Sequence, residues 1–301
     1  MSNKENEQQS YVGEDLKALL AYWTPERIKN TQPVKSPNIR NGIKDTKHSS
    51  QYVNEIEEIV TLASSEPDDG GDRGVPDKVE DVNAFPYCCA GKIVATHEDG
   101  KDYHGTAQFV GHCRMVLTAA HVVRNPTTGE YYKNIVFLAK YKEDPDPSYE
   151  TFSFEVIQTH DEWIGENRAY DYAFCRTKKT EPNYPKWLAL QIGIPTWQLM
   201  AIGYPGKSGE DPDGSTMYKV NGVIGKHGGG IVEMKYNPLE KGCSGGFWMK
   251  PSIPLLPVVG INSYSPDNDD SIEISPLFDQ QTIDLFNKVL DVSSEEPRRC
   301  D

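Results

Sequence analysis

This sequence contains no long apolar run. No stretch of 18 apolar residues occurs among its 301 residues, so a membrane span is not expected. Basic residues are the minority, with 31 Lys and Arg against 45 Asp and Glu and a formal net charge of −14. Because a field of that sign repels phosphate backbones, nucleic acid is not an expected partner. Residues 1–10 also lack the apolar core and small-residue cleavage site of a signal peptide, so the compartment stays open.

Cysteine is scarce as well, and its spacing forms no motif. The six cysteines are too few and too scattered for a disulfide scaffold. No CxxC pair occurs, so zinc-ribbon spacing is absent. The pairing of the cysteines and the redox compartment stay open. The residues are Cys88, Cys89, Cys113, Cys175, Cys243 and Cys300.

No metal or cofactor site is expected. His104, His112 and Cys113 could form part of a metal site, but no second ligand pair stands at a suitable spacing, so a hairpin with solvated imidazoles is favoured. Residues 267–270 lack the spaced oxygen pattern and the later Glu of a calcium loop. Residues 227–230 are a turn and not a phosphate loop, because no strand-to-helix frame surrounds them.

Residues 1–75 are polar and show no alternating strand pattern. Thr24 and Pro25 predict a helix start, since Thr can cap free N–H groups and Pro suits the first turn. A second helical pattern covers residues 51–62, and the charged, glycine-containing run 66–74 is typical of an exposed linker. Two interpretations stay open: a disordered tail, or a pro-segment that ends in a cleavable linker.

Two zones of short apolar runs follow, over residues 76–180 and 181–274. Turn residues separate the runs, a pattern that indicates an all-β barrel or sandwich, and the repeated style favours two similar barrels. The apolar period then becomes helical over residues 275–291, which predicts a C-terminal helix before a tail at 292–301. The expected strands lie at 92–95, 106–110, 115–118, 134–139, 151–157, 171–175, 199–203, 217–224, 230–235, 246–249 and 256–261.

Two segments supply a candidate base and the acid that would orient it. His121 follows an apolar strand within the string TAAH, where small neighbours leave the imidazole edge open. Asp171, in DYAF, immediately precedes another apolar strand. There its carboxylate can accept the Nδ1–H of the histidine, which holds the tautomer and stabilises the imidazolium. Asp161 is the competing acid, but no strand follows it directly.

A glycine-rich turn carries the candidate nucleophile, Ser244, in the string GCSGG. The backbone N–H groups of Gly242 and Ser244 can point at the oxygen on which negative charge develops during acyl transfer. Gly245 and Gly246 have no side chains to obstruct a substrate backbone. Cys243, directly before the serine, is the rival nucleophile.

The order TAAH, DYAF, GCSGG resembles the chymotrypsin-like serine peptidases, and more closely their glutamyl endopeptidase branch. The resemblance covers about residues 80–290, and the string YWTPERI at 22–28 is similar to prosegments found ahead of such domains. It implies an all-β fold of two perpendicular six-stranded antiparallel β-barrels with the active site between them, no metal cofactor, and a secreted protein. Cysteine peptidases of this fold carry Cys directly before Gly-Gly, a frame that Ser244 satisfies and Cys243 does not. Further matching segments lie at 84–87, 203–206, 217–222 and 258–261.

The sequence departs from this family where specificity is set. Glutamyl endopeptidases have a pocket Thr and a pocket His where this chain has Leu239 and Asn262. The resemblance implies that Leu239, Asn262, Ser263 and Tyr264 line the primary pocket, and that Ser263 donates to Asp171. Because an unpaired carboxylate is costly to desolvate, neutral or apolar residues before the scissile bond are expected over Glu and Asp. A free N-terminal amine that reached the pocket after maturation would reverse this preference.

The expected function is a serine endopeptidase that acts as a monomer on proteins or peptides through a Ser-His-Asp acyl-enzyme mechanism. If residues 1–75 are a pro-segment, the chain is expected to be a zymogen that this segment holds inactive. Two alternatives remain. One is a catalytically silent, protease-like binding module, and the other is an esterase that uses the same three residues.

Overall fold

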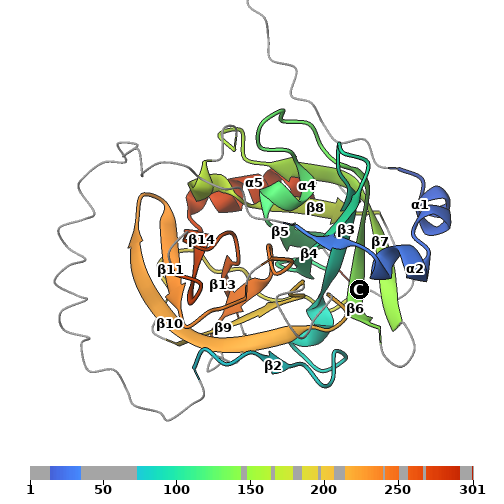
Figure 1. The fold of residues 1–301 in the computed structure, drawn as a ribbon. Coiled ribbons are helices and arrows are strands. Elements are labelled where there is room, and N and C mark those ends of the chain that lie inside the picture. Colours follow the sequence, from blue (N-terminus) through green and yellow to red (C-terminus); the bar gives the residue numbers. More distant parts are fainter. Residues whose placement is uncertain are drawn as a thin grey trace, which may run out of the picture.

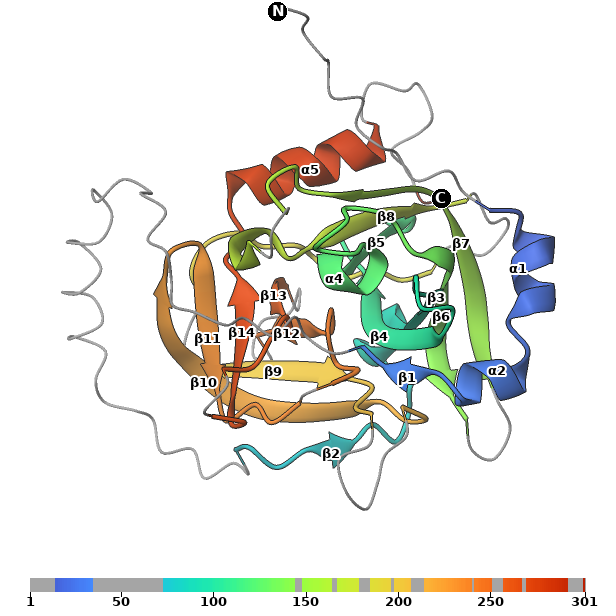
Figure 2. The same cartoon turned by 45° about the horizontal axis from the view of Figure 1, so that its top comes forward.

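The computed structural model describes residues 14–34, 73–143, 148–163, 167–178, 185–195, 198–206, 214–239, 241–250, 257–266, 269–291 and 300. Figures 1 and 2 show two curled sheets side by side, with one helix, α5, across the top. The expected helix at 51–62 and most of the expected linker at 66–74 lie outside the described residues. Within those residues, no helix is long and apolar enough to cross a membrane.

Six antiparallel strands form the first barrel, in the order β4-β3-β6-β7-β8-β5, and a further pairing of β4 with β5 closes it. Its interior is apolar, and every residue of β3 is buried. Lys92 in β3 is tolerated there because its ammonium lies 4.8 Å from the ring of Tyr141 and donates to the carbonyl of Ile28. The strands are β3 (Ala90–Thr96), β4 (Asp102–Phe109), β5 (Met115–Thr118), β6 (Lys133–Lys142), β7 (Ser148–Thr159) and β8 (Ala173–Thr177).

The second sheet also has six strands in one path, in the order β13-β12-β9-β10-β11-β14. It curls so that its two ends approach each other where Tyr264, just after β13, bridges Ile274 in β14. The short strand β2 (Asp77–Lys78) adds to β10. The strands of the path are β9 (Gln198–Gly203), β10 (Tyr218–Gly228), β11 (Ile231–Lys235), β12 (Phe247–Met249), β13 (Val258–Ile261) and β14 (Ile272–Pro276).

The predicted C-terminal helix, α5 (Gln280–Leu290), begins five residues later than its apolar period indicated. Residues 275 and 276 pair with β11 as the end of β14. Asp279 then caps the helix, because its carboxylate accepts from the N–H groups of Gln281 and Thr282. The predicted all-β architecture of two barrels with a C-terminal helix is confirmed. Shorter helical elements are α1 (Leu16–Tyr22), α2 (Pro25–Lys29), η1 (Tyr87–Cys89), α4 (Ala120–Val123) and η2 (Arg168–Tyr170).

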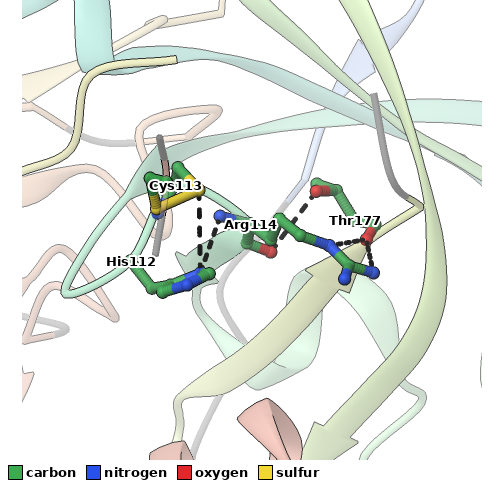
Figure 3. Close-up of a disulfide and its surroundings, with 5 residues drawn as sticks. His112, Cys113, Arg114 and Thr177 are labelled. Atoms are coloured by element: carbon green, nitrogen blue, oxygen red, sulfur yellow. Dashed lines mark hydrogen bonds between the residues drawn. A yellow bond between two sulfur atoms is a disulfide. The ribbon is translucent and has the colours of Figure 1, made fainter. Parts of the chain in front are cut away.

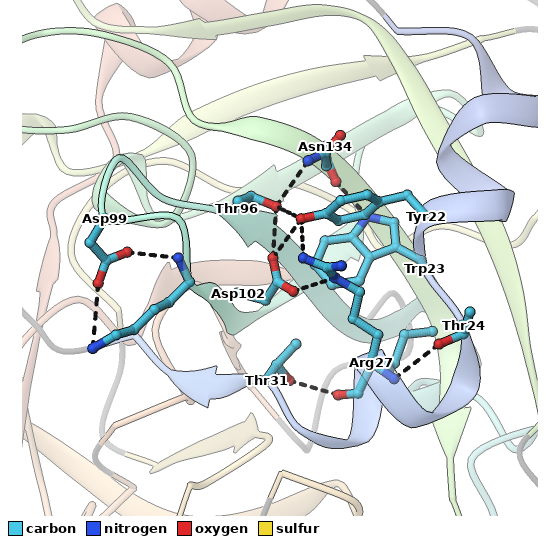
Figure 4. Close-up of polar contacts among 11 residues, drawn as sticks. Tyr22, Trp23, Thr24, Arg27, Thr31, Thr96, Asp99, Asp102 and Asn134 are labelled. Atoms are coloured by element: carbon cyan, nitrogen blue, oxygen red, sulfur yellow. Dashed lines mark hydrogen bonds and ion pairs between the residues drawn. The ribbon is translucent and has the colours of Figure 1, made fainter.

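The N-terminal segment, residues 14–34, packs on the first barrel. Thr24 caps α2 and Pro25 is its first residue, as the sequence predicts. Trp23 is buried and donates its indole N–H to the carbonyl of Asn134 at 2.6 Å. Arg27 pairs with Asp102 in β4, and Figure 4 shows these side chains converging on the barrel wall. A cut within residues 35–72 would therefore leave the N-terminal segment attached through noncovalent contacts.

Candidate active site

His121 lies at the junction of the two sheets, in the single turn of α4 that follows β5. Two small, fully buried residues, Ala119 and Ala120, let the chain turn tightly there. The backbone N–H of His121 donates to Asp171 Oδ1 at 3.0 Å, and its Nδ1 lies 2.7 Å from Asp171 Oδ2. The other ring nitrogen, Nε2, has no hydrogen-bond partner among the described residues. The imidazole is thus oriented through one nitrogen, and the other is available to take up a proton.

Asp171 is placed by η2, which ends directly before it, and by β8, which begins two residues later. Its carboxylate is buried, and it accepts a third hydrogen bond, from the hydroxyl of Ser263. Three hydrogen bonds to one carboxylate fix its orientation. The competing acid, Asp161, is exposed in a turn.

The turn that carries Ser244 is anchored on the first barrel. The carbonyl of Ser244 accepts from the N–H of Thr106 in β4 at 2.9 Å. Gly245 has a φ of +90°, and a Cβ there would lie 2.3 Å from the hydroxyl oxygen of Thr118, three residues before His121. Glycine is needed here because the chain's own backbone approaches closely. This approach brings the Ser244 turn against the strand end that leads to His121.

Cys243 points the other way. It is fully buried in the apolar cluster of the second sheet. Its Sγ packs against the backbone of Gly203, because a Cβ added to Gly203 would lie only 2.4 Å from this sulfur. Its neighbours Gly242 and Ser244 carry the polar groups of the turn.

The N–H of Gly242, a predicted oxyanion donor, is bonded to the N-terminal segment. It donates to the carbonyl of Val34 at 3.2 Å. The N–H of Val34 in turn donates to the carbonyl of His104 at 2.9 Å. Just before Val34, β1 (Gln32–Pro33) runs parallel to β4, with Pro33 opposite His104. No sequence pattern indicates this contact, because it joins a short polar segment to a turn more than 200 residues away.

His104 holds the N-terminal segment and is not exposed in a hairpin as the sequence suggested. It is fully buried, and its Nδ1 lies 3.1 Å from the hydroxyl of Thr31. Its Nε2 lies 3.2 Å from the carbonyl of Tyr204 in the second sheet. Burial, and then the charge of Lys92, holds the pKa of His104 well below its usual range. A neutral His104 therefore links the N-terminal segment to both sheets.

The four residues predicted for the primary pocket occupy different surroundings. Leu239 lies in the apolar cluster of the second sheet and is 1% exposed. Ser263 bonds to Asp171, and Tyr264 is 3% exposed beneath the side chain of Arg168. Asn262 is fully buried. The structure thus brings Ser263 and Tyr264 to Asp171, and it places Leu239 within the apolar cluster of the second sheet.

All four hydrogen-bonding positions of the Asn262 amide are used inside the protein. Its Oδ1 accepts from Trp248 Nε1 at 2.7 Å and from Asn237 Nδ2 at 3.0 Å. Its Nδ2 donates to the carbonyls of Ile202 and Cys243 at 2.8 and 3.2 Å. Since an amide offers two donors and two acceptor sites, none remains for a substrate.

His112 and Cys113 lie apart from His104, at a turn before β5 (Figure 3). Cys113 forms a disulfide with Cys300, with a Cα–Cα distance of 5.9 Å. His112 Nδ1 accepts from the backbone N–H of Arg114 at 3.2 Å. Sulfur atoms joined in a disulfide are not thiolate ligands, so this cluster is a covalent tie between β5 and the C-terminus.

No protein-family profile and no curated protein matches the sequence. The fold is similar to that of the protease Anisep from Arthrobacter nicotinovorans, at a TM-score of 0.60 and 19% identity over 71% of this chain and 99% of that one. It is also similar to that of the thermostable serine protease AL20 from an extremophilic microorganism, at a TM-score of 0.60 and 20% identity over 68% of this chain and 98% of that one. A third similar fold is that of a Glu endopeptidase, at a TM-score of 0.58 and 15% identity over 73% of this chain and 97% of that one. The chain therefore has the fold of the chymotrypsin-like serine proteases.

Proposed function

We propose that this chain is a serine endopeptidase with Ser244 as nucleophile, His121 as general base and Asp171 as the acid that orients it. Ser244 Oγ attacks the peptide carbonyl and its proton passes to His121 Nε2. The resulting oxyanion accepts from the N–H groups of Gly242 and Ser244. The imidazolium then protonates the leaving amine, and water attacks the acyl-enzyme by the same route.

The observation that carries this proposal is the bonded chain from Ser263 through Asp171 to His121. The carboxylate receives three donors, and the imidazole is left with a single unpartnered nitrogen among the described residues. A histidine with only a structural role would be expected to use both nitrogens when buried. The similarity to the folds of two proteases and a Glu endopeptidase supports the same proposal at the level of fold.

Serine is preferred to cysteine as nucleophile because of where Cys243 lies. Its sulfur is packed in the second sheet's apolar cluster. Burial in such surroundings disfavours a thiolate, which is the reactive form of cysteine.

The test is hydrolysis of a protein and of a peptide library by the purified chain, alongside Ser244→Ala and Cys243→Ala. The proposal expects cleavage that is lost in Ser244→Ala and retained in Cys243→Ala. Loss only in Cys243→Ala would assign a cysteine peptidase. Turnover of esters without peptides would favour the esterase, and peptide binding without turnover would favour the binding module.

We also propose that the N-terminal segment inhibits the enzyme until residues 35–72 are cut and the segment leaves. The support is the bond from the Gly242 N–H to the carbonyl of Val34, since a substrate carbonyl needs that donor. The buried anchors of the segment, Leu19, Trp23 and Ile28, explain why it would stay in place before activation.

Limited proteolysis tests this second proposal. Cutting within residues 35–72, followed by separation of the released segment, should raise kcat/KM, and adding residues 14–34 back as a peptide should lower it again. A chain that is equally active before cutting, after cutting and with the peptide added would contradict inhibition. A truncated core that fails to fold would instead show that residues 14–34 are part of the stable domain.

A further inference from the structure

The side chain of Arg168 has no carboxylate partner among the described residues. The chain has 45 acidic residues against 31 basic ones, so carboxylates are plentiful. No described carboxylate lies within ion-pair distance of Arg168. Its guanidinium instead lies 3.8 Å above the ring of Tyr264, and its Nε is buried without a hydrogen-bond partner among the described residues.

The guanidinium groups of other arginines in and around the first barrel bind carboxylate, carbonyl or hydroxyl oxygens. Arg27 pairs with Asp102, and Arg114 and Arg176 pair with Glu155. Arg124, which also lies over a tyrosine ring, donates to the carbonyl of Gly129 and to the hydroxyl of Thr159. Since guanidinium groups match carboxylates through two parallel N–H bonds, Arg168 has unused capacity for such a group.

Arg168 lies next to Asp171, so a carboxylate bound to its guanidinium would lie close to the proposed catalytic residues. Arg168 begins η2, which ends directly before Asp171, so it belongs to the first barrel. Tyr264 belongs to the second sheet and follows Ser263, whose hydroxyl donates to Asp171. The guanidinium therefore spans the junction of the two sheets beside the catalytic acid.

The ring of Tyr264, beneath Arg168, fixes the position of the guanidinium. Tyr264 is held at both backbone groups by Ile274, with its N–H donating at 3.3 Å and its carbonyl accepting at 2.8 Å. Burial raises the pKa of its hydroxyl to about 12, against the opposing effects of the Arg168 charge and of a hydrogen bond from the Arg168 side chain. Tyr264 stays neutral at ordinary pH and offers a fixed face for stacking, so the guanidinium is pre-oriented without being neutralised.

We propose that Arg168 binds a carboxylate side chain of the peptide substrate, at a position near the scissile bond other than the residue directly before it. This inference rests on the proposed peptidase function and names a specificity residue for it. The residue directly before the bond is a separate matter, because the groups expected there, Leu239 and Asn262, offer no cation and no unused amide donor.

The experiment compares paired peptides that carry Glu or Gln, and Asp or Asn, at each of four positions on either side of the cleaved bond. The enzyme is the full chain, both intact and cut within residues 35–72. A charge-assisted pair predicts a kcat/KM about tenfold or more higher for the acidic member at one position. Arg168→Gln should reduce that ratio to about one, and Arg168→Lys should retain part of it. Arg124→Gln is the matched control and should keep the full ratio.

Binding to the Ser244→Ala chain, cut in the same way, separates this proposal from the proposed function. If no peptide is hydrolysed, the peptidase assignment fails. A tighter Kd for the acidic peptide that disappears on Arg168→Gln would still support the carboxylate site. If peptides are hydrolysed but no position prefers an acid, or the preference survives Arg168→Gln, the role of Arg168 is wrong.

Discussion

The two sides of the candidate active site differ in how their polar groups are satisfied. On one side, Gly242 and His104 are bonded to Val34 and Thr31 of the N-terminal segment. On the other, Asp171 receives its donors from within the barrels, and Arg168 next to it has no carboxylate partner among the described residues. On the first side, the N-terminal segment occupies the hydrogen-bonding groups. On the second side, the guanidinium of Arg168 has no carboxylate partner among the described residues.

Under the two proposals, this difference separates regulation from recognition. On the first side, the N-terminal segment must release the donors before a substrate can use them. On the second side, the carboxylate site that we propose at Arg168 needs no such rearrangement, because its guanidinium has no carboxylate partner among the described residues.

The largest loss of activity is expected from a substitution of Asp171. Asp171→Asn should lower kcat by about 10⁴, because an amide cannot hold the Nδ1–H tautomer of His121. Ser263→Ala removes only one of three donors to the carboxylate, so a loss of about tenfold is expected. Single-turnover hydrolysis measures both. Equal losses for the two variants would mean that Ser263 contributes more than a supporting bond.

Weakening the N-terminal segment should activate the uncut chain. Leu19 is 1% exposed, and Leu19→Ala should weaken docking by about 2–5 kcal/mol. Basal activity of the uncut chain should then rise by about tenfold or more. Leu20, its 51% exposed neighbour on α1, is the matched control, and Leu20→Ala should leave activity unchanged. If Leu19→Ala only lowers activity, the segment supports the active site and does not block it.

Asn262→Ala should affect stability more than primary specificity. The change leaves the Trp248 and Asn237 donors and two carbonyls without this partner, at about 1–3 kcal/mol for each buried group left unsatisfied. Urea unfolding should show a lower midpoint, while the residue preferred directly before the cut stays neutral or apolar. A shift of that preference at unchanged stability would place the amide in the substrate pocket after all.

A smaller, pH-dependent effect is expected at His97, which is stacked on Tyr132 at 3.6 Å and near Tyr103 at 4.2 Å. Burial lowers the pKa of His97 from 6.5 to about 4. As the pH falls through that window, the unfolded chain binds a proton that the folded chain refuses, so stability decreases. His97→Phe retains the stacking and should flatten the loss between pH 6.5 and 4, as measured by denaturant unfolding at a series of pH values. An unchanged slope would exclude His97 as its source.

The sequence predicted the parts of the site that are local. His121, Asp171 and Ser244 each stand in a short string with a strand at one side, and those strings identify the fold family as well. The contacts of Val34 and Arg168 were not predictable, because they depend on how distant segments meet. Leu239 was expected in the pocket because the resemblance places it at the position of a pocket Thr, and the structure shows it buried in the apolar cluster of the second sheet. The disulfide of Cys113 with Cys300 spans 187 residues and leaves no spacing signal.

The most direct test of the central claim is labelling with a fluorophosphonate probe, followed by peptide mapping. We expect a single adduct on Ser244 that forms faster after residues 35–72 are cut, is absent in Ser244→Ala and forms much more slowly in His121→Ala. No adduct in the cut wild-type chain, or an adduct that persists in Ser244→Ala, would contradict the assignment of Ser244 as an activated nucleophile.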